Sequence, residues 1–304
     1  MELLQKNERT YFSNDDAFPS PHDHIHFYLM SDYSIGMHRQ EFFEINIVTR
    51  GKGIHYIGNR ALNAEAGDVF IIPPKVDHGY TGGNGFDVYH IIISNKYIHK
   101  YFAELRSVEG FSMLFNVEPI MRASSGKLSH LKLTHEQFKK IDGLLCERNG
   151  KHSSLSVEEM FINTGAFLII VTNLCRFYIE NGALTNEETE CKDTSFMQAL
   201  ALIHEKYNEK LTIERLAKEA RMSRATFTRR FICICKLPPA EYIIRKRVEV
   251  AESMLKTSNT TISEIAESVG FYDIAHFSKV FSKYHGCSPI EYRKNSMKQG
   301  FSIT

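Results

Sequence analysis

Two short segments in the last third of the chain carry side chains suited to reading a polyanion. Phe227 and Phe231 are four residues apart and predict the buried side of a helix. Thr228 and Arg229 then fall on its opposite side, where arginine can donate two hydrogen bonds to guanine and a hydroxyl suits bases or phosphates. A matching segment follows further along the chain. The predicted DNA-binding residues are Arg224, Ala225, Thr228, Arg229, Ala275, His276, Ser278 and Lys279.

Both segments belong to a duplication that must position them. LTIERLAKEARMSRATFTRRF, from Leu211, matches TISEIAESVGFYDIAHFSKVF, from Thr261. The first predicted helix of each copy matches at a shift of 49 residues and the second at a shift of 50, so one extra residue falls in the turn between them. This pattern predicts helix-turn-helix units at about 212–234 and 261–285, joined by a helix that begins near Pro239. The predicted buried stripe of that joining helix is Ile244, Val248, Ala251 and Leu255.

Charge divides the chain of 304 residues into two parts. Residues 194–304 hold 18 Lys+Arg and 11 Asp+Glu, a net charge of +7, whereas residues 1–193 carry −6. The basic part fits double-stranded DNA as a partner. No segment resembles a signal peptide or approaches the roughly 18 apolar residues of a membrane helix, so we predict a cytoplasmic protein, at the bacterial nucleoid, without a membrane partner. The six cysteines lack metal-binding spacing, and Cys233 and Cys235 are predicted to be buried thiols.

The first part of the chain predicts β-structure followed by helices. Segments such as HIHFYLM, FFEINIVTR and DVFIIPP, within residues 22–94, are short and separated by turn residues, which is typical of a closed barrel or jelly roll. Thr134 and Gln137 then form a capping-box pattern at the start of a helical pair that ends near Gly182. The broad apolar stripe of this pair fits burial against the barrel or a dimer seam, and both interpretations remain open.

Residues 194–296 resemble the DNA-binding domain of the AraC/XylS family of bacterial transcription regulators. The resemblance is carried by TISEIAESVGFYDIAHFSKVFSKYHGCSPIEYRK and by its weaker first copy. In that first copy Cys235 and Lys236 replace a His-Gly pair. The resemblance implies sequence-specific DNA binding by a homodimer, with RNA polymerase as a further candidate partner.

Two segments of the β-rich part resemble the two motifs of the cupin fold. HRQEFFEINIVTRGKG begins at His38, and GDVFIIPPKVDHGY begins at Gly67. In metal-binding cupins the matching positions hold three histidines and a glutamate, but here Gln40 stands at one histidine position, and amide oxygen is a weaker ligand for zinc-like metals. We therefore predict a polar ligand pocket without a metal, a cofactor or catalytic residues. The predicted ligand-binding residues are His38, Gln40, Glu44, His78 and Tyr80.

The middle of the chain is similar to the branch of the family that contains the rhamnose-responsive regulators. FAELRSVEGFSMLFNVEPIMR and LIIVTNLCRFYIENG carry this similarity, which implies a sugar as the small-molecule effector. Residues 1–21, with Tyr11, Phe12 and Phe18, fit an arm over the pocket or a disordered terminus equally well. The predicted fold class is α+β with two domains: a cupin-like β-barrel (jelly roll) with a helical pair over 1–181, a linker over 182–193, an all-α AraC-type DNA-binding domain over 194–296 and a tail over 297–304.

The function that these features predict is a ligand-responsive, sequence-specific DNA-binding transcription regulator, an activator of carbohydrate-utilisation genes, and not an enzyme. One alternative is a ligand-independent regulator in which the cupin domain serves only dimerisation. Others are a metal-dependent cupin enzyme with an attached DNA-binding domain and a thiol redox sensor that uses Cys233 and Cys235. An effector can control DNA binding only through different affinities for two states of the protein.

Overall fold

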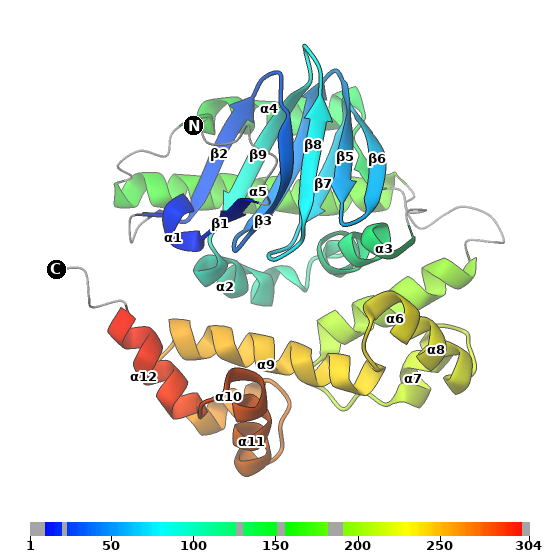
Figure 1. Ribbon diagram of the computed structural model, residues 1–304, viewed down its shortest axis with the longest axis vertical. Coiled ribbons are helices and arrows are strands. Elements are labelled where there is room, and N and C mark those ends of the chain that lie inside the picture. The colour runs from blue at the N-terminus through cyan, green and yellow to red at the C-terminus, as the bar shows by residue number, and fades with distance from the viewer. Residues whose placement is uncertain (1–9, 20–22, 126–129, 151–155, 182–190, 300–304) are drawn as a thin grey trace. The chain divides into compact units, whose positions relative to one another are not determined.

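A computed structural model describes residues 10–19, 23–125, 130–150, 156–181 and 191–299 (Figure 1). The chain divides into two compact units, an N-terminal unit of Met1–Glu187 and a C-terminal unit of Glu188–Thr304. Most of the predicted linker, 182–190, lies outside the described residues. Its last three residues already belong to the first helix of the C-terminal unit, α6 (Cys191–Lys206).

Over the described residues, the N-terminal unit holds two five-stranded β-sheets, which confirms the predicted β-rich fold (Figure 1). Neighbouring strands are antiparallel except β1 and β3. The first sheet has the order β1 (Thr10–Phe12), β3 (Ile35–Gln40), β8 (His78–Gly82), β5 (Lys52–Ile57) and β6 (Arg60–Glu65). The second has the order β10 (Leu131–Lys132), β7 (Asp68–Ile72), β4 (Phe43–Arg50), β9 (Asp87–Ile93) and β2 (Ile25–Met30).

The central strands of the second sheet are buried on both faces. Successive side chains of a strand point to opposite faces, so Ile45 and Ile47 face away from Glu44 and Asn46. Ile45 and Ile47 are fully buried. Helices cover the outer face, because α3 (Glu118–Ser125) contacts β7, and α4 (His135–Arg148) and α5 (Val157–Glu180) contact β2. The polar residues Glu44 and Asn46 therefore lie on the inner face of the second sheet.

Helix α4 begins at the predicted capping box. The Thr134 hydroxyl accepts a hydrogen bond from the Gln137 backbone N–H, and Gln137 Oε1 accepts one from the Thr134 backbone N–H. This pair satisfies two N–H groups that have no partner within the helix, which confirms the predicted start. The remaining helical segments of the unit are α1 (Asn14–Ala17), α2 (Asn95–Leu105) and the π-helix η1 (Ser112–Val117).

Helix α5 has one buried side and one exposed apolar side. Phe167, Ile170 and Leu174 are fully buried, whereas Phe161 is 66% exposed and Ile169 is exposed as well. By length and composition alone α5 is apolar enough to cross a membrane, which corrects the sequence prediction that no segment approaches this. Its buried side packs against α4, β2 and β10, as expected of a core helix.

The C-terminal unit is all helical over the described residues. After α6 its helices are α7 (Ile213–Glu219), α8 (Arg224–Cys235), α9 (Pro239–Thr257), α10 (Ile262–Ser268), α11 (Ile274–His285) and α12 (Pro289–Gln299). The hydroxyls of Thr212 and Ser223 cap α7 and α8. Helix α9 begins at Pro239, as predicted. Pairs α7–α8 and α10–α11 are the two helix-turn-helix units.

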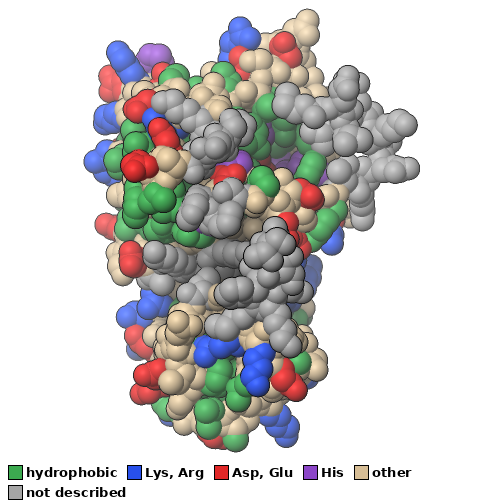
Figure 2. Space-filling model, turned by 90° about the vertical axis from the view of Figure 1, so that its left-hand side faces the viewer, with side chains coloured by type: hydrophobic (Ala, Val, Ile, Leu, Met, Phe, Trp, Pro, Cys, Tyr) green, Lys and Arg blue, Asp and Glu red, His purple; other side chains and the backbone are tan. Residues whose placement is uncertain are grey.

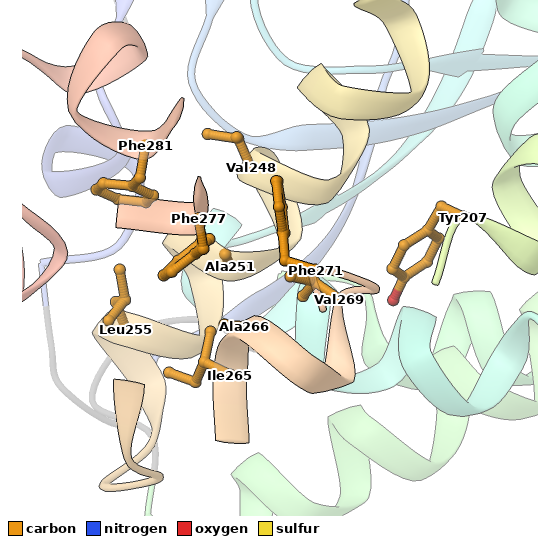
Figure 3. Packing of buried hydrophobic residues seen from close by; sticks show 10 residues of the cluster. All are labelled: Tyr207, Val248, Ala251, Leu255, Ile265, Ala266, Val269, Phe271, Phe277 and Phe281. Atoms are coloured by element: carbon orange, nitrogen blue, oxygen red, sulfur yellow. The ribbon is translucent and has the colours of Figure 1, made fainter. Parts of the chain in front are cut away.

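Helix α9 contributes to two separate cores. In the core of the first helix-turn-helix unit, Tyr242 packs edge-on against Phe231, which also contacts Phe196 of α6. In the second unit α9 supplies part of a buried cluster with α10 and α11 (Figure 3). The predicted stripe of α9 needs one correction: Ile243 is buried and Ile244 only half-buried, because the helix turns a different side toward the first core than toward the second.

The extra residue of the second unit is Tyr272. Met222 donates its backbone N–H to Ala217 in the first turn, and Phe271 donates to Ala266 in the second, a shift of 49. The caps that follow, Ser223 and Asp273, are separated by 50. Tyr272 is therefore inserted between turn and cap, and it is 88% exposed.

Candidate functional sites

The first recognition helix, α8, gathers four of the predicted DNA-binding residues around a surface hollow. Phe227 and Phe231 anchor the helix because both are fully buried in the first core. The opposite side lines the hollow with Arg224, Ala225, Thr228, Arg229 and Ile232. Of these, Arg224, Ala225 and Arg229 are exposed and Thr228 is half-buried.

Ile232 is the member of this surface that the sequence prediction missed. Its side chain is 42% exposed although it is large and apolar. The available signal was its position four residues after Thr228, which places both on one side of a helix. In a major groove such a side chain suits the methyl group of thymine.

The second recognition helix, α11, presents the other four predicted residues. Ala275, His276 and Lys279 are exposed and Ser278 is half-buried, while the side chains that anchor the helix point into the second core (Figure 3). The Asp273 carboxylate caps the helix by accepting hydrogen bonds from the backbone N–H groups of Ala275 and His276. The first backbone donors of α11 therefore already hold an anion, whereas α8 is capped by a neutral hydroxyl.

The charged side chains of α8 differ in their packing. Arg224 Nη1 lies 2.8 Å from Glu214 Oε1, and both groups are largely exposed. Because such a pair is worth at most about 1 kcal/mol in water, Arg224 can exchange Glu214 for a phosphate. Arg230 instead lies over the Phe196 ring, 5.0 Å from its centroid.

The two cysteines of α8 do not share one environment. Cys233 is exposed, which corrects the prediction that both thiols are buried. Cys235 is partly buried, and this burial raises the pKa of its thiol to about 12. A raised pKa leaves little thiolate for redox chemistry, and the helical spacing places the two residues on different sides of α8.

The residues predicted to bind the ligand meet between the two sheets of the N-terminal unit. His38 and His78 pair across β3 and β8 in the first sheet, and Glu44 reaches them from β4 in the second. Figure 2 shows histidine side chains recessed below the surface of this unit. All five predicted residues are buried: His38, Gln40, Glu44, His78 and Tyr80.

Glu44 is the centre of this interior cluster. Its Oε1 lies 2.6 Å from His90 Nδ1, and its Oε2 lies 2.9 Å from Gln40 Nε2 and 3.3 Å from His78 Nε2. Burial alone would raise the pKa of the Glu44 carboxyl, but the hydrogen bonds from His78 and His90 hold the pKa well below its usual range. The cluster therefore contains a buried carboxylate anion.

Three further residues of the cluster were outside the predicted ligand-binding set. Asn46 donates its amide to the Tyr80 hydroxyl at 3.1 Å, His90 stacks on Tyr28, and His55 stacks on Tyr80. Strand alternation gave a signal for Asn46, because it follows Glu44 by two residues. His90 lies in a strand whose residues are all buried, so its sequence pattern does not separate an inner from an outer face.

The first described residues, Thr10–Phe12, lie beside this cluster. Thr10–Phe12 forms β1, which pairs with β3 alongside His38 and Gln40. The Phe12 ring meets the His38 ring edge-on, with 5.3 Å between their centroids. Residues 10–12 of the predicted arm therefore pair with the first sheet, while 1–9 and 20–22 lie outside the described residues.

Comparison with known families finds one match for each part of the chain. The AraC-like ligand binding domain family matches residues 14–163, and a helix-turn-helix domain family matches residues 216–295. The first range contains the interior cluster, and the second contains both recognition helices.

Similar proteins are transcription regulators. The Msm operon regulatory protein of Streptococcus mutans is 24% identical over 275 residues, covering 86% of this chain and 87% of that protein. The transcriptional activator RhaR of Mannheimia succiniciproducens is 22% identical over 307 residues, covering 98% and 99%. Among solved structures, the DNA-binding domain of AdpA in complex with a target DNA is 31% identical, covers 34% of this chain and 95% of that chain, and has a TM-score of 0.34. The chain belongs to the AraC family of DNA-binding transcription regulators, with an AraC-like ligand-binding domain ahead of its helix-turn-helix domain.

Proposed function

We propose that this regulator activates carbohydrate-utilisation genes when a sugar binds the interior cluster of the N-terminal unit. The RhaR proteins to which it is similar are named transcriptional activators, which supports the direction of regulation. The sugar binds more tightly to the state of the protein that activates transcription, and this difference in affinity is the source of control.

The observation that carries the proposal is a set of buried polar atoms that have no hydrogen-bond partner among the residues that the structure describes. They are Asn46 Oδ1, His55 Nε2 and His90 Nε2. A buried polar atom without a partner costs about 1–3 kcal/mol, so such atoms are rare unless a ligand or water satisfies them. Several directed acceptors and donors beside the aromatic rings of Tyr28 and Tyr80 suit a molecule that carries many hydroxyl groups.

We propose that the eight residues on α8 and α11 contact DNA, with Arg229 reading a base and Lys279 holding the backbone. The support is their placement on the sides of α8 and α11 opposite the buried phenylalanines. The same surface of a second helix enters the major groove in helix-turn-helix proteins.

We also propose that the exposed side of α5 forms the seam of a homodimer. Val157, Phe161, Ile162 and Ile169 lie on this helix, and together they form an apolar surface that a second copy can bury. Phe161→Glu is expected to convert the dimer to a monomer in sedimentation velocity, while Lys139→Glu on the exposed side of α4 is expected to leave the dimer intact. A dimer that survives Phe161→Glu places the seam elsewhere.

The effector is tested by titrating a panel of monosaccharides into the full chain by calorimetry, with wild type and Asn46→Leu in parallel. One sugar is expected to bind, and loss of the Asn46 amide is expected to weaken binding at least tenfold. Asn59→Leu, at an exposed turn, is the matched control and is expected to bind as wild type does.

The response is tested by transcription in vitro from the promoter of the neighbouring genes. Addition of the bound sugar is expected to raise transcript yield with wild-type protein and not with Asn46→Leu. If no sugar binds and DNA affinity is the same throughout the panel, the ligand-independent alternative replaces the proposal.

A further inference from the structure

The loop between α6 and α7, residues 207–212, is built into the core of the other helix-turn-helix unit. Tyr207 belongs to the buried cluster of the second unit, in which Phe271 also lies (Figure 3). A Cβ at Gly270 would lie 2.6 Å from the Asn208 carbonyl oxygen, so the two backbones approach without room for a side chain. The segment that leads into the first unit therefore packs against the turn of the second.

Arg247 of α9 binds this loop directly. Its Nε donates a hydrogen bond to the Tyr207 carbonyl oxygen at 2.7 Å, and its Nη2 donates one to the Glu209 carbonyl oxygen at 2.8 Å. The guanidinium carbon lies 5.8 Å from the centroid of the Phe271 ring. A planar guanidinium carries several donors and stacks on aromatic rings, so one side chain can hold two carbonyls and an aromatic ring at once. Arg247 thus joins the loop before α7 to the turn before α11.

The same loop is held to the first unit at both of its ends. The Glu209 carboxylate lies 2.9 Å from Lys206 Nζ of α6 and 3.7 Å from Arg215 Nη1 of α7. The Thr212 hydroxyl caps α7 by accepting a hydrogen bond from the Arg215 backbone N–H. Helix α7 in turn packs against α8. A displacement of the loop relative to the second unit therefore displaces the first recognition helix.

The two helix-turn-helix units are consequently connected twice. The first connection is α9, which supplies side chains to both cores. A helix that joins two bodies still lets them bend relative to each other, because long helices curve. The second connection runs from residues 207–209 through Arg247 to the turn before α11, and it restrains this motion. Hydrogen bonds from a charged donor are roughly twice as strong as neutral ones, so the restraint depends on the Arg247 guanidinium.

We propose that Arg247 is a positioning residue that fixes the separation and the angle between α8 and α11. It thereby makes the protein selective for the spacing of the two DNA segments that these helices contact. The inference rests on the proposed DNA contacts of α8 and α11. One extra base pair moves the second segment by about 3.4 Å along the duplex and turns it by about 35°. Two restrained helices can follow only if the DNA is deformed, which costs free energy.

The test measures binding of the full chain to DNA by fluorescence anisotropy. A duplex is selected from a random-sequence library, hydroxyl-radical protection locates the two segments that one chain covers, and one base pair is inserted between them. The insertion is expected to weaken wild-type binding about tenfold or more. Arg247→Met keeps the apolar stem and removes both hydrogen bonds, so the insertion is expected to weaken its binding by less than about threefold. Arg245→Met, which removes an exposed pair with Glu249 on the same helix, is the matched control and is expected to behave as wild type does.

Two further measurements separate spacing from folding and from the DNA contacts themselves. A duplex that keeps only the segment contacted by α8 is expected to bind wild type and Arg247→Met equally. Arg247→Lys keeps the charge without the planar fork and is expected to show intermediate spacing selectivity. Equal spacing selectivity in wild type and Arg247→Met, or weaker binding of the single-segment duplex by Arg247→Met, overturns the proposal. Unchanged binding of the two-segment duplex by both Arg229→Ala and Lys279→Ala would instead refute the proposed contacts of α8 and α11.

Discussion

The two recognition helices share one design of core and differ at their surfaces. Each buries two phenylalanines four residues apart, so the helices are held in the same way. The exposed side of α8 carries Arg229 behind a neutral Ser223 cap, whereas that of α11 carries Lys279 behind the Asp273 carboxylate. A guanidinium is a planar fork that fits a base edge, and an ammonium is a point charge that fits a phosphate. We therefore propose that the two copies of the fold make two kinds of DNA contact.

The largest expected difference between the two helix-turn-helix units is the loss of stability caused by a substitution in the turn. Gly270 has φ +89°, and a Cβ there would lie 2.6 Å from the Asn208 carbonyl oxygen. Gly270→Ala adds left-handed backbone strain and a clash with backbone, and is expected to lower the free energy of unfolding by about 3 kcal/mol. Urea denaturation of the full chain measures it.

The matching turn of the first unit supplies the control. Arg221 already occupies the left-handed region with a side chain, at φ +52°. Arg221→Ala keeps a Cβ in the left-handed region and removes only the outer part of an exposed side chain, so it is expected to change stability by no more than about 1 kcal/mol. Similar losses in the two variants would show that the close approach at Asn208 is not what requires glycine.

The DNA contacts of the two helices are expected to fail differently. Arg229→Ala should lose about 1–3 kcal/mol of discrimination at one base pair. Lys279→Ala should weaken binding to all sequences alike and lower the salt dependence by about one unit. Fluorescence anisotropy with singly substituted DNA sites at two salt concentrations separates the two outcomes. Unchanged base preference in Arg229→Ala removes the proposed difference between α8 and α11.

Substitutions at the C-terminal ends of α8 and α11 are expected to change stability in opposite directions. Lys236 and Gly286 both end their helix in the left-handed region, at φ +60° and +72°. Lys236→Gly is expected to raise the free energy of unfolding by about 1 kcal/mol, and Gly286→Ala is expected to lower it by a similar amount. Both changes are measured as shifts in the midpoint of thermal unfolding. No atom of the described residues lies within 4 Å of a Cβ at Gly286, so the expected cost there is backbone strain. Changes of the same sign would refute this account.

Mild acid is expected to destabilise the C-terminal unit through a buried histidine of its first helix-turn-helix core. Burial and the nearby Lys246 hold the pKa of His204 well below its ordinary value of 6.5, while its Nε2 contacts the Tyr242 hydroxyl. The unfolded chain therefore binds a proton that the folded chain does not, and stability is lost as the pH falls below about 6.5. His204→Gln should reduce this loss in urea titrations compared at about pH 7.5 and 5.5.

The second unit is the internal reference for that pH effect. There the aligned tyrosine, Tyr292, donates its hydroxyl to Glu252, and the neighbouring His285 ring lies 3.6 Å from the same carboxylate. Burial would raise the pKa of Glu252, but Lys256 and Tyr292 lower it below its usual 4.5, so this contact fails only in stronger acid. An equal slope of stability with pH in wild type and His204→Gln would show that His204 is not the acid-sensitive group.

Features with a local cause could be predicted from the sequence. The helix starts at Thr134, Thr212 and Ser223 follow from side chains three residues or fewer from the groups they cap. The extra residue in the second turn followed from the slip in the repeat. The meeting of His38, Glu44 and His78 was suggested only by resemblance, because strand pairing across two sheets is not written in a local pattern.

Other features depended on packing that no local pattern records. Ile232 on α8 and Phe161 on α5 are large apolar residues with exposed side chains. Hydrophobic periodicity alone does not show which apolar surface of a helix remains uncovered. The membrane-like composition of α5 has the same origin, since one of its sides is core and the other is apolar surface.

Helix α9 has a consequence for how the C-terminal unit unfolds. Tyr242 at its start belongs to the core around Phe231, and Leu255 near its end belongs to the core around Phe281. Neither core is complete without the same continuous helix, so loss of one exposes apolar surface of the element that supports the other. The duplicated halves are thus expected to melt in a single cooperative transition, with the slowest amide hydrogen exchange in the middle of α9, and not as two domains in series.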